Sequence, residues 1–266
     1  MSFTPQSKEP VPVSRMKTCV REGWLVALLL LAGCGTSKEL SIEPRNGARF
    51  VIIYQPSHQT DTGEDFNEAL VCNSIVEAAV AASTGVVMVH KVWSYNTEGI
   101  HHARQGSNTK IDHTSAVDSL GRISGYAYEL RESNKFLPDV FIAVHNNGAT
   151  NRHACWGFVH EGDQYEEQNR ELAKEFVDEI CRVTGLENAG ALGDSSPNRN
   201  DYRCKNTGRL SFYSLDENVN TAPIRVLLEI GDNKVSCNFL MNPKNQREIG
   251  EVIQRVVERR FRRAGK

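Results

Sequence analysis

Short, continuous apolar runs alternate with helix-like segments along this chain, and this alternation limits the possible fold more than any other feature. Strand-like runs are expected near residues 49–54, 85–90, 139–144, 156–160, 210–215 and 224–230. Helical patterns are expected near residues 68–82, 120–133, 165–183 and 245–262. Strands that are apolar on both faces need cover on both sides, which is typical of parallel sheets. The sequence therefore predicts a three-layer α/β domain, with a mostly parallel twisted sheet flanked by helices.

The N-terminus resembles the signal of a bacterial lipoprotein. A basic segment that ends at Arg21 precedes an apolar stretch over residues 24–31, which is too short to cross a bilayer stably. The sequence Leu31-Ala32-Gly33-Cys34 follows directly and resembles a lipobox, in which the cysteine becomes the lipid-modified first residue. An uncleaved N-terminal anchor helix is the alternative. Translation from Met16 would give the signal a more usual length.

Cleavage before Cys34 would divide the chain into three parts. These are a signal peptide over residues 1–33, a lipid-anchored tether over residues 34–47 and a catalytic domain over residues 48–266. The tether is short and polar, as a flexible connection requires. Gly35 rather than Asp after the cysteine resembles outer-membrane sorting in bacteria with two membranes, so we expect an envelope protein anchored in the outer membrane and facing the periplasm. A bacterium with a single membrane would place it outside instead.

The charge balance argues against nucleic-acid binding, and the cysteines leave disulfide pairing open. The chain has 31 basic and 33 acidic residues and a formal net charge of −2, so no overall positive field would recruit nucleic acid. Five cysteines follow the lipobox, at Cys72, Cys155, Cys181, Cys204 and Cys237. Export permits disulfides, but the wide spacings leave their pairing open. A Cys/His peptidase is a weaker alternative because none of these cysteines has a local nucleophile signature.

Polar residues stand where three of the predicted strands end. His58 follows the first strand, His145 follows the third, and Glu229 lies near the end of the last. The carboxyl ends of parallel strands meet at one edge of a sheet, where ligands bind in such folds. Glu68 opens the first predicted helix, ten residues after His58, and adds a carboxylate at the same edge.

Two imidazoles and one carboxylate are the ligand set of a catalytic zinc ion, which keeps a fourth position open for water. A further carboxylate, Glu229, would act as the general acid/base of amide hydrolysis. Each residue also has a simpler interpretation: a histidine is commonly structural, and Glu68 would favour a helix N-terminus in any protein. Glu229 is harder to explain in this way, because a carboxylate in an apolar strand is costly to bury without a partner.

The order of these motifs resembles the zinc-dependent N-acetylmuramoyl-L-alanine amidases of bacterial cell walls. The best-matching segments are residues 138–147, with sequence PDVFIAVHNN, and residues 223–231, with sequence PIRVLLEIG. Residues 154–158 and Arg122, which heads a predicted helix, also match. The resemblance runs over nearly the whole predicted domain, from residue 50 to residue 261.

The resemblance implies Zn²⁺ held by His58, Glu68 and His145, with Glu229 catalytic. It also implies cleavage of the amide between N-acetylmuramic acid and L-alanine in peptidoglycan, with Arg122 and Asn147 near the substrate or the metal. Ser57-His58-Gln59-Thr60 stands where the family usually has Gly-His-Gly-Gly, and the run to the glutamate is shorter. Carboxylates at positions 61, 64 and 65 compete for the second ligand position, but only Glu68 begins an apolar-periodic helix.

Two other functions stay open. One is a related zinc hydrolase of another amide, similar to the N-formylglutamate amidohydrolases. The other is an inactive lipoprotein that binds peptidoglycan without cutting it. Lipid anchoring disfavours a cytosolic metabolite as substrate, and retention of both histidines and Glu229 disfavours an inactive domain. The need for an activator protein stays open as well. The long polar segment over residues 94–118 is unusual unless it has a function.

Overall fold

The computed structural model describes most of the predicted catalytic domain. The described residues are 43–45, 49–60, 62, 66–95, 97, 99–101, 123–148, 150–195, 204, 206–209 and 211–262. The predicted signal peptide, Cys34 and Arg122 lie outside them, as does most of the tether. Within these ranges, no helix is both long enough and apolar enough to span a membrane.

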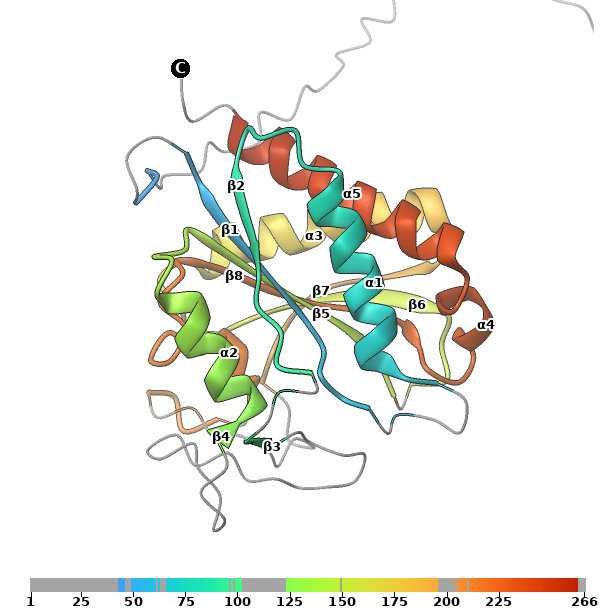
Figure 1. The fold of residues 1–266 in the computed structure, drawn as a ribbon, viewed down its shortest axis with the longest axis horizontal. Coiled ribbons are helices and arrows are strands. Elements are labelled where there is room, and N and C mark those ends of the chain that lie inside the picture. The colour runs from blue at the N-terminus through green and yellow to red at the C-terminus, as the bar shows by residue number, and fades with distance from the viewer. Residues whose placement is uncertain are drawn as a thin grey trace, which may run out of the picture. The chain divides into compact units, whose positions relative to one another are not determined.

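A six-stranded sheet lies at the centre of the domain, in the order β2-β1-β5-β8-β6-β7 (Figure 1). Its strands are β1 (Val51–Pro56), β2 (Met88–Lys91), β5 (Val140–Asn147), β6 (Ala154–Val159), β7 (Glu187–Gly193) and β8 (Ile224–Asp232). Neighbouring strands pair in parallel, except that β6 and β8 are antiparallel. Two short strands, β3 (Ile100–His101) and β4 (Ile123–Ser124), form a separate parallel pair. The prediction of a mostly parallel sheet is confirmed.

Helices cover both faces of this sheet, as the sequence predicts (Figure 1). On one face lie α1 (Glu68–Ala81), α3 (Glu166–Thr184) and α5 (Pro243–Phe261). On the other lie α2 (Gly125–Asn134) and the 3-10 turn η1 (Tyr213–Leu215). A short helix, α4 (Cys237–Leu240), precedes α5.

The central strands are buried on both sides because they are apolar at nearly every position. In β1, Ile52 and Tyr54 belong to the core beneath α1, α3 and α5, while Val51 and Ile53 belong to the core beneath α2. All six residues of β1 are buried. The first three residues of β1 are aliphatic, and the polar Gln55 comes only near the end of the strand.

Helix α1 begins at the residue that the sequence predicts. The Asn67 side chain accepts a hydrogen bond of 3.1 Å from the backbone N–H of Leu70 and so caps the helix. The backbone N–H of Ala69 donates to the carbonyl of Gln59 at 2.9 Å. The start of the helix is therefore fastened to the chain that leaves β1, which brings Glu68 to the carboxyl edge of the sheet.

One expectation for the region around the last strands is wrong, and one strand there was not expected. No strand forms over residues 211–215, where η1 packs Tyr213 and Leu215 into the core beneath α2. The carbonyl of Leu215 accepts a hydrogen bond of 2.8 Å from the Arg225 side chain rather than from a neighbouring strand. The sequence also gives no sign of β7, an edge strand that pairs only with β6 and whose residues are half-buried or exposed. Two glycines and the lack of β-branched residues hide it.

The packing around Gly250 predicts that alanine at this position destabilises the protein, although helix propensity alone would favour alanine. It lies in the middle of α5, where alanine would normally be favoured by about 1 kcal/mol. A Cβ at this position would lie 2.7 Å from both the Cβ of Ala78 and the backbone nitrogen of Ala79 in α1. Gly250→Ala is therefore expected to lower the free energy of unfolding by about 1–3 kcal/mol. Urea denaturation measures this change.

The control for Gly250 is the exposed neighbouring position. Glu251→Ala places the same side chain on the solvent face of α5, where surface changes are usually within about 0.5 kcal/mol. Equal stability of the two variants would show that α1 and α5 do not approach as closely as described.

Candidate active site

Three of the predicted site residues lie at the carboxyl edge of the sheet because β1, β5 and β8 run parallel. His145 on β5 pairs in register with Glu229 on β8. His58 follows the end of β1, where the backbone N–H of Ser57 still donates to the carbonyl of Val144 at 2.9 Å. The prediction that these strand ends share one edge is confirmed by the register.

A cavity of about 220 Å³ opens at this edge. Its walls include Glu68 from α1, His145 from β5 and Glu229 from β8. The other residues that line it are Gln59, Thr62, Tyr126, Asn146, Gly148, Phe212, Tyr213, Ser214, Leu227 and Asn233. The structure thus brings three of the four predicted chemical groups to one space, and His58 lies beside Tyr126 with ring centroids 4.0 Å apart.

Glu68 and His145 form a buried pair. The Oε1 atom of Glu68 lies 3.1 Å from the Nδ1 atom of His145, and only 2% and 5% of the two residues is exposed. The backbone N–H of Asn146 donates to the same carboxylate oxygen at 3.3 Å. Burial by itself would lower the pKa of His145. The hydrogen bond and charge of Glu68, with the charge of Glu229, outweigh that effect and raise this pKa above its ordinary value.

One atom of this pair suits a metal ligand. The Nε2 atom of His145 is buried and has no hydrogen-bond partner among the described residues. A buried polar atom without a partner is costly and needs an explanation in terms of function or a bound species. An imidazole nitrogen beside a carboxylate and facing a polar cavity is a donor set that zinc favours. Glu68 and His145 therefore fit as two ligands of a zinc ion.

His58 is held by a carboxylate that the sequence does not reveal. Its Nδ1 atom lies 3.4 Å from the Oε2 atom of Glu129 on α2. Glu129 is fully buried and accepts three further hydrogen bonds, from Gln55 Nε2 at 2.5 Å and from the N–H and Oγ of Ser94 at 2.8 and 2.7 Å. A carboxylate that fixes the orientation of a histidine ring is the usual partner of a metal-binding histidine.

The ligand atoms of His58 do not yet converge with those of the buried pair. The ligand atoms of His58, Glu68 and His145 do not all lie within 4.8 Å of one another. The ring of His58 packs against α2, where a Cβ on Gly125 would lie 3.1 Å from its Nε2 atom. This glycine therefore lets the helix approach the imidazole, and a three-residue metal centre requires His58 to shift towards His145.

The remaining predicted site residues are distributed as follows. Asn147 ends β5 with a half-buried side chain and is absent from the cavity wall, whereas its neighbour Asn146 is part of it. Arg122 and the competing carboxylates at positions 61, 64 and 65 lie outside the described residues. Sequence reasoning missed Glu129, Tyr126 and Asn146. Glu129 lies on a helix rich in polar residues, so no pattern distinguishes it from a solvated glutamate.

The cysteine nearest the cavity is not an activated nucleophile. Cys72 is buried, and its thiol donates to the Oδ1 atom of Asn146 at 3.3 Å. Burial and the charges of Glu68 and Glu229 raise its pKa well above the ordinary value, which disfavours the thiolate. All five described cysteines are free thiols, so no disulfide forms among them.

No protein-family model matches the sequence, and no curated protein matches it. Solved structures match its fold. The catalytic domain of the N-acetylmuramoyl-L-alanine amidase CwlV from Bacillus (Paenibacillus) polymyxa var. colistinus aligns with a TM-score of 0.53 at 12% identity, over 79% of this chain and 97% of that chain. Apo Ami1, an N-acetylmuramyl-L-alanine amidase from Mycobacterium abscessus, gives 0.54 at 15% identity, over 80% and 99%. The CwlD amidase from Clostridioides difficile, in complex with the GerS lipoprotein, gives 0.53 at 15% identity, over 80% and 98%.

These alignments cover almost the whole of each amidase domain. The described residues therefore have the fold of N-acetylmuramoyl-L-alanine amidases, which confirms the fold that the sequence motifs imply.

Proposed function

We propose that this chain is a zinc-dependent N-acetylmuramoyl-L-alanine amidase that cleaves the amide between N-acetylmuramic acid and L-alanine in peptidoglycan. The observation that carries the proposal is the convergence of Glu68, His145 and Glu229 on one cavity at the carboxyl edge of the sheet. The amidase fold supports it, because the cavity lies where α/β folds bind their ligands. His58 completes the ligand set with Glu68 and His145.

In this proposal, different side chains of the cavity bind the metal, transfer the proton and exclude water. His58, Glu68 and His145 would hold a zinc ion, which would supply Lewis-acid chemistry in the cavity. The Glu229 carboxylate, half-buried in the cavity wall and paired in register with His145, takes a proton from water and gives it to the leaving nitrogen. Tyr126 and Phe212 line the same space and shield the reacting amide from bulk water.

The proposal is tested on the products. The purified full chain, loaded with zinc, is incubated with peptidoglycan, and the soluble fraction is analysed by mass spectrometry. We expect stem peptides with a free N-terminal L-alanine, and none after treatment with a chelator. Intact polymer from folded, zinc-loaded protein would favour the binding lipoprotein instead. Turnover of a small N-acyl amino acid but not of peptidoglycan would favour the other amide hydrolase.

Because Glu129 orients His58, its substitution is expected to weaken zinc binding. Glu129→Gln removes the charge that orients His58 while it keeps the size of the side chain. Loss of such a partner typically weakens metal binding about 10–100-fold, and we expect that range in competition against a chelator. Glu132→Gln is the matched control, since Glu132 is on the same helix but pairs with Lys135 at 2.5 Å. Unchanged zinc affinity in folded Glu129→Gln would exclude this orienting role.

We propose in addition that the chain is a lipoprotein of the cell envelope, anchored through Cys34. The lipobox and the short apolar stretch before it support this proposal. Labelling cells with an alkyne-bearing fatty acid should tag the wild-type chain and leave Cys34→Ser untagged. Tagging of the serine variant, or none of either chain, would refute the anchor.

A further inference from the structure

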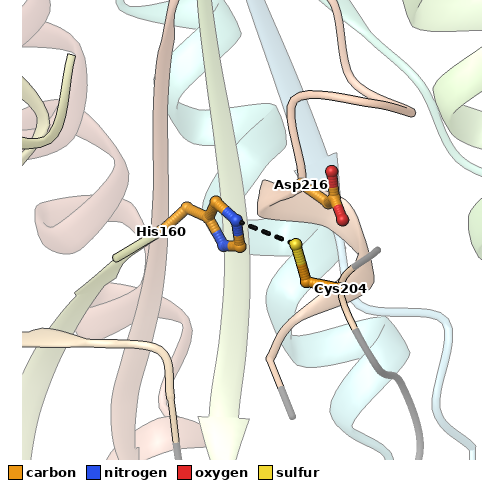
Figure 2. A group of neighbouring side chains, drawn as sticks. All are labelled: His160, Cys204 and Asp216. Carbon is orange, nitrogen blue, oxygen red and sulfur yellow. Dashed lines mark hydrogen bonds between the residues drawn. The ribbon is translucent and has the colours of Figure 1, made fainter. Parts of the chain in front are cut away.

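Figure 2 shows a second group of side chains with metal-binding chemistry. It consists of His160, which follows β6, and of Cys204 and Asp216 from the connection between β7 and β8. Each offers one ligand atom, and these atoms all lie within 4.8 Å of one another. Among the described residues, this is the one such group of three or more histidine, cysteine or acidic side chains.

This group is displaced from Glu229 along the sheet, towards the start of β8. Because β6 and β8 are antiparallel, Trp156 pairs with Glu229 and Phe158 pairs with Leu227. His160 lies four residues beyond Trp156, in the direction of the start of β8. Four residues of strand span about 13 Å. The group is therefore distinct from the cavity that holds the proposed zinc ligands.

Asp194 orients the histidine of this group. Its Oδ2 atom lies 2.9 Å from the Nδ1 atom of His160, and it also accepts from the backbone N–H groups of Glu161 and Phe212, both at 3.2 Å. With Nδ1 engaged, the Nε2 atom of His160 faces the sulfur of Cys204 at 3.5 Å, as Figure 2 shows. This is the arrangement in which a carboxylate fixes the ring of a metal-binding histidine.

A cysteine, a histidine and an aspartate also form the catalytic triad of cysteine nucleophiles, but the burial of this group disfavours a catalytic triad here. Cys204 is 0% exposed and His160 is 2% exposed, whereas a nucleophile must meet a substrate. The residues that line the cavity include neither of them. Asp216, which is 0% exposed, offers a ligand atom within 4.8 Å of those of His160 and Cys204, as a third metal ligand would.

Two buried aspartates, Asp194 and Asp216, lie beside His160 and Cys204. Asp194 pairs with His160, and the Oδ1 atom of Asp216 accepts from the backbone N–H and the Nδ2 atom of Asn218 at 2.7 and 2.6 Å. A metal ion at this place would add positive charge to a buried group that contains two carboxylates, which favours its binding.

We propose that His160, Cys204 and Asp216 form a second metal site, which takes a divalent transition-metal ion of the zinc class. A thiolate and an imidazole favour such ions over Mg²⁺ or Ca²⁺. Binding releases the thiol proton of Cys204 to solvent and forms the metal–sulfur bond with the resulting thiolate. Three protein ligands leave one tetrahedral position for water.

The site would fasten one wall of the proposed active site. Residues 204–216 contain Phe212, Tyr213 and Ser214, all of which line the cavity. A metal ion that joins Cys204 and Asp216 to His160 holds both ends of this segment against β6. This consequence rests on the proposed function, but the metal site itself does not.

The test uses Co²⁺ as the probe, because a cobalt–thiolate bond gives a charge-transfer absorption that imidazole and carboxylate ligands do not. The purified full chain loaded with Co²⁺ should show this absorption, and Cys204→Ser should lose it. His145→Ala should keep it, which separates this site from the proposed catalytic one. Cys237→Ser, a half-buried cysteine outside the group, should keep it as well.

Two results would overturn the proposal. One is the absence of the absorption in the wild-type chain at saturating Co²⁺, which needs no variant and so does not depend on whether Cys204→Ser folds. The other is its loss in Cys72→Ser with retention in Cys204→Ser, which would assign the thiolate to the neighbourhood of Glu68. X-ray absorption at the zinc edge of the wild-type chain gives an independent result, since sulfur among the zinc ligands is expected only if a cysteine binds.

Discussion

Glu229→Gln is expected to lower the rate of amide cleavage by about 10³-fold and to leave zinc binding intact. General acid/base catalysis by a positioned side chain typically contributes about 10²–10⁴-fold, and glutamine cannot take up a proton. Glu229 is half-buried at the end of β8 and faces the cavity, so the shape of the site should survive the change. The rate of release of free N-terminal L-alanine measures the effect.

A matched control separates loss of chemistry from loss of structure. Glu251→Gln makes the same change on the exposed face of α5 and should keep wild-type activity. Metal content and thermal unfolding should be alike in both variants. Activity of folded Glu229→Gln within a few-fold of wild type would remove Glu229 from the reaction and transfer the proton to another group.

His145→Ala is expected to abolish both the catalytic metal and the activity. Loss of a residue that merely orients a ligand costs about 10–100-fold in affinity, so loss of a ligand should cost more than about 100-fold. The bound metal should fall by one ion per chain, while the cobalt–thiolate absorption of the second site stays. Elemental analysis and cobalt spectroscopy together measure the two sites separately.

The control for this variant is a histidine with no place in the cavity. His153 is exposed, its Nδ1 atom lies 2.8 Å from the Oγ atom of Ser236, and its ring contacts Phe239. His153→Ala should retain the full metal content. Equal zinc affinity in His145→Ala and wild type would contradict the ligand role and leave the buried Nε2 atom of His145 without an explanation.

The two proposed sites would give zinc two separable roles in one domain. The proposed catalytic ion would sit at the carboxyl edge, where the parallel strands end, and the second ion would sit beyond β6, which runs the other way. Removing the second ion is expected to affect activity only through Phe212, Tyr213 and Ser214 in the cavity wall. Kinetic loss in Cys204→Ser should then appear mainly in substrate binding, because Glu229 and the first ligand set are unchanged.

The sequence predicts that the candidate site residues lie at the carboxyl edge of the sheet, because buried apolar strands leave polar residues few other positions. Residues 140–144, for example, are apolar throughout, so the polar residues that follow them are expected at a strand end. Glu68 was predictable for a related reason, since an apolar-periodic segment that begins at this residue indicates a helix start. Parallel pairing then brings these positions together without further information, as the pairing of His145 with Glu229 shows.

Glu129 and the second site were not predictable, because they depend on contacts between distant parts of the chain. Glu129 reaches Gln55 over 74 residues and Ser94 over 35. His160 and Cys204 are 44 residues apart, a spacing that matches no metal-binding motif. Edge strand β7 and turn η1 likewise owe their conformations to neighbours rather than to local propensity.

The sequence by itself determined the layers of this protein and the edge at which it presents its polar groups, because hydrophobic periodicity decides which segments are buried and where they end. Only the tertiary structure decided which polar groups meet. The direction of β6 separates His160 from Glu229, and the docking of α2 places Glu129 against His58. Contacts of this kind are formed by packing between distant elements, and the local pattern of residues does not encode them.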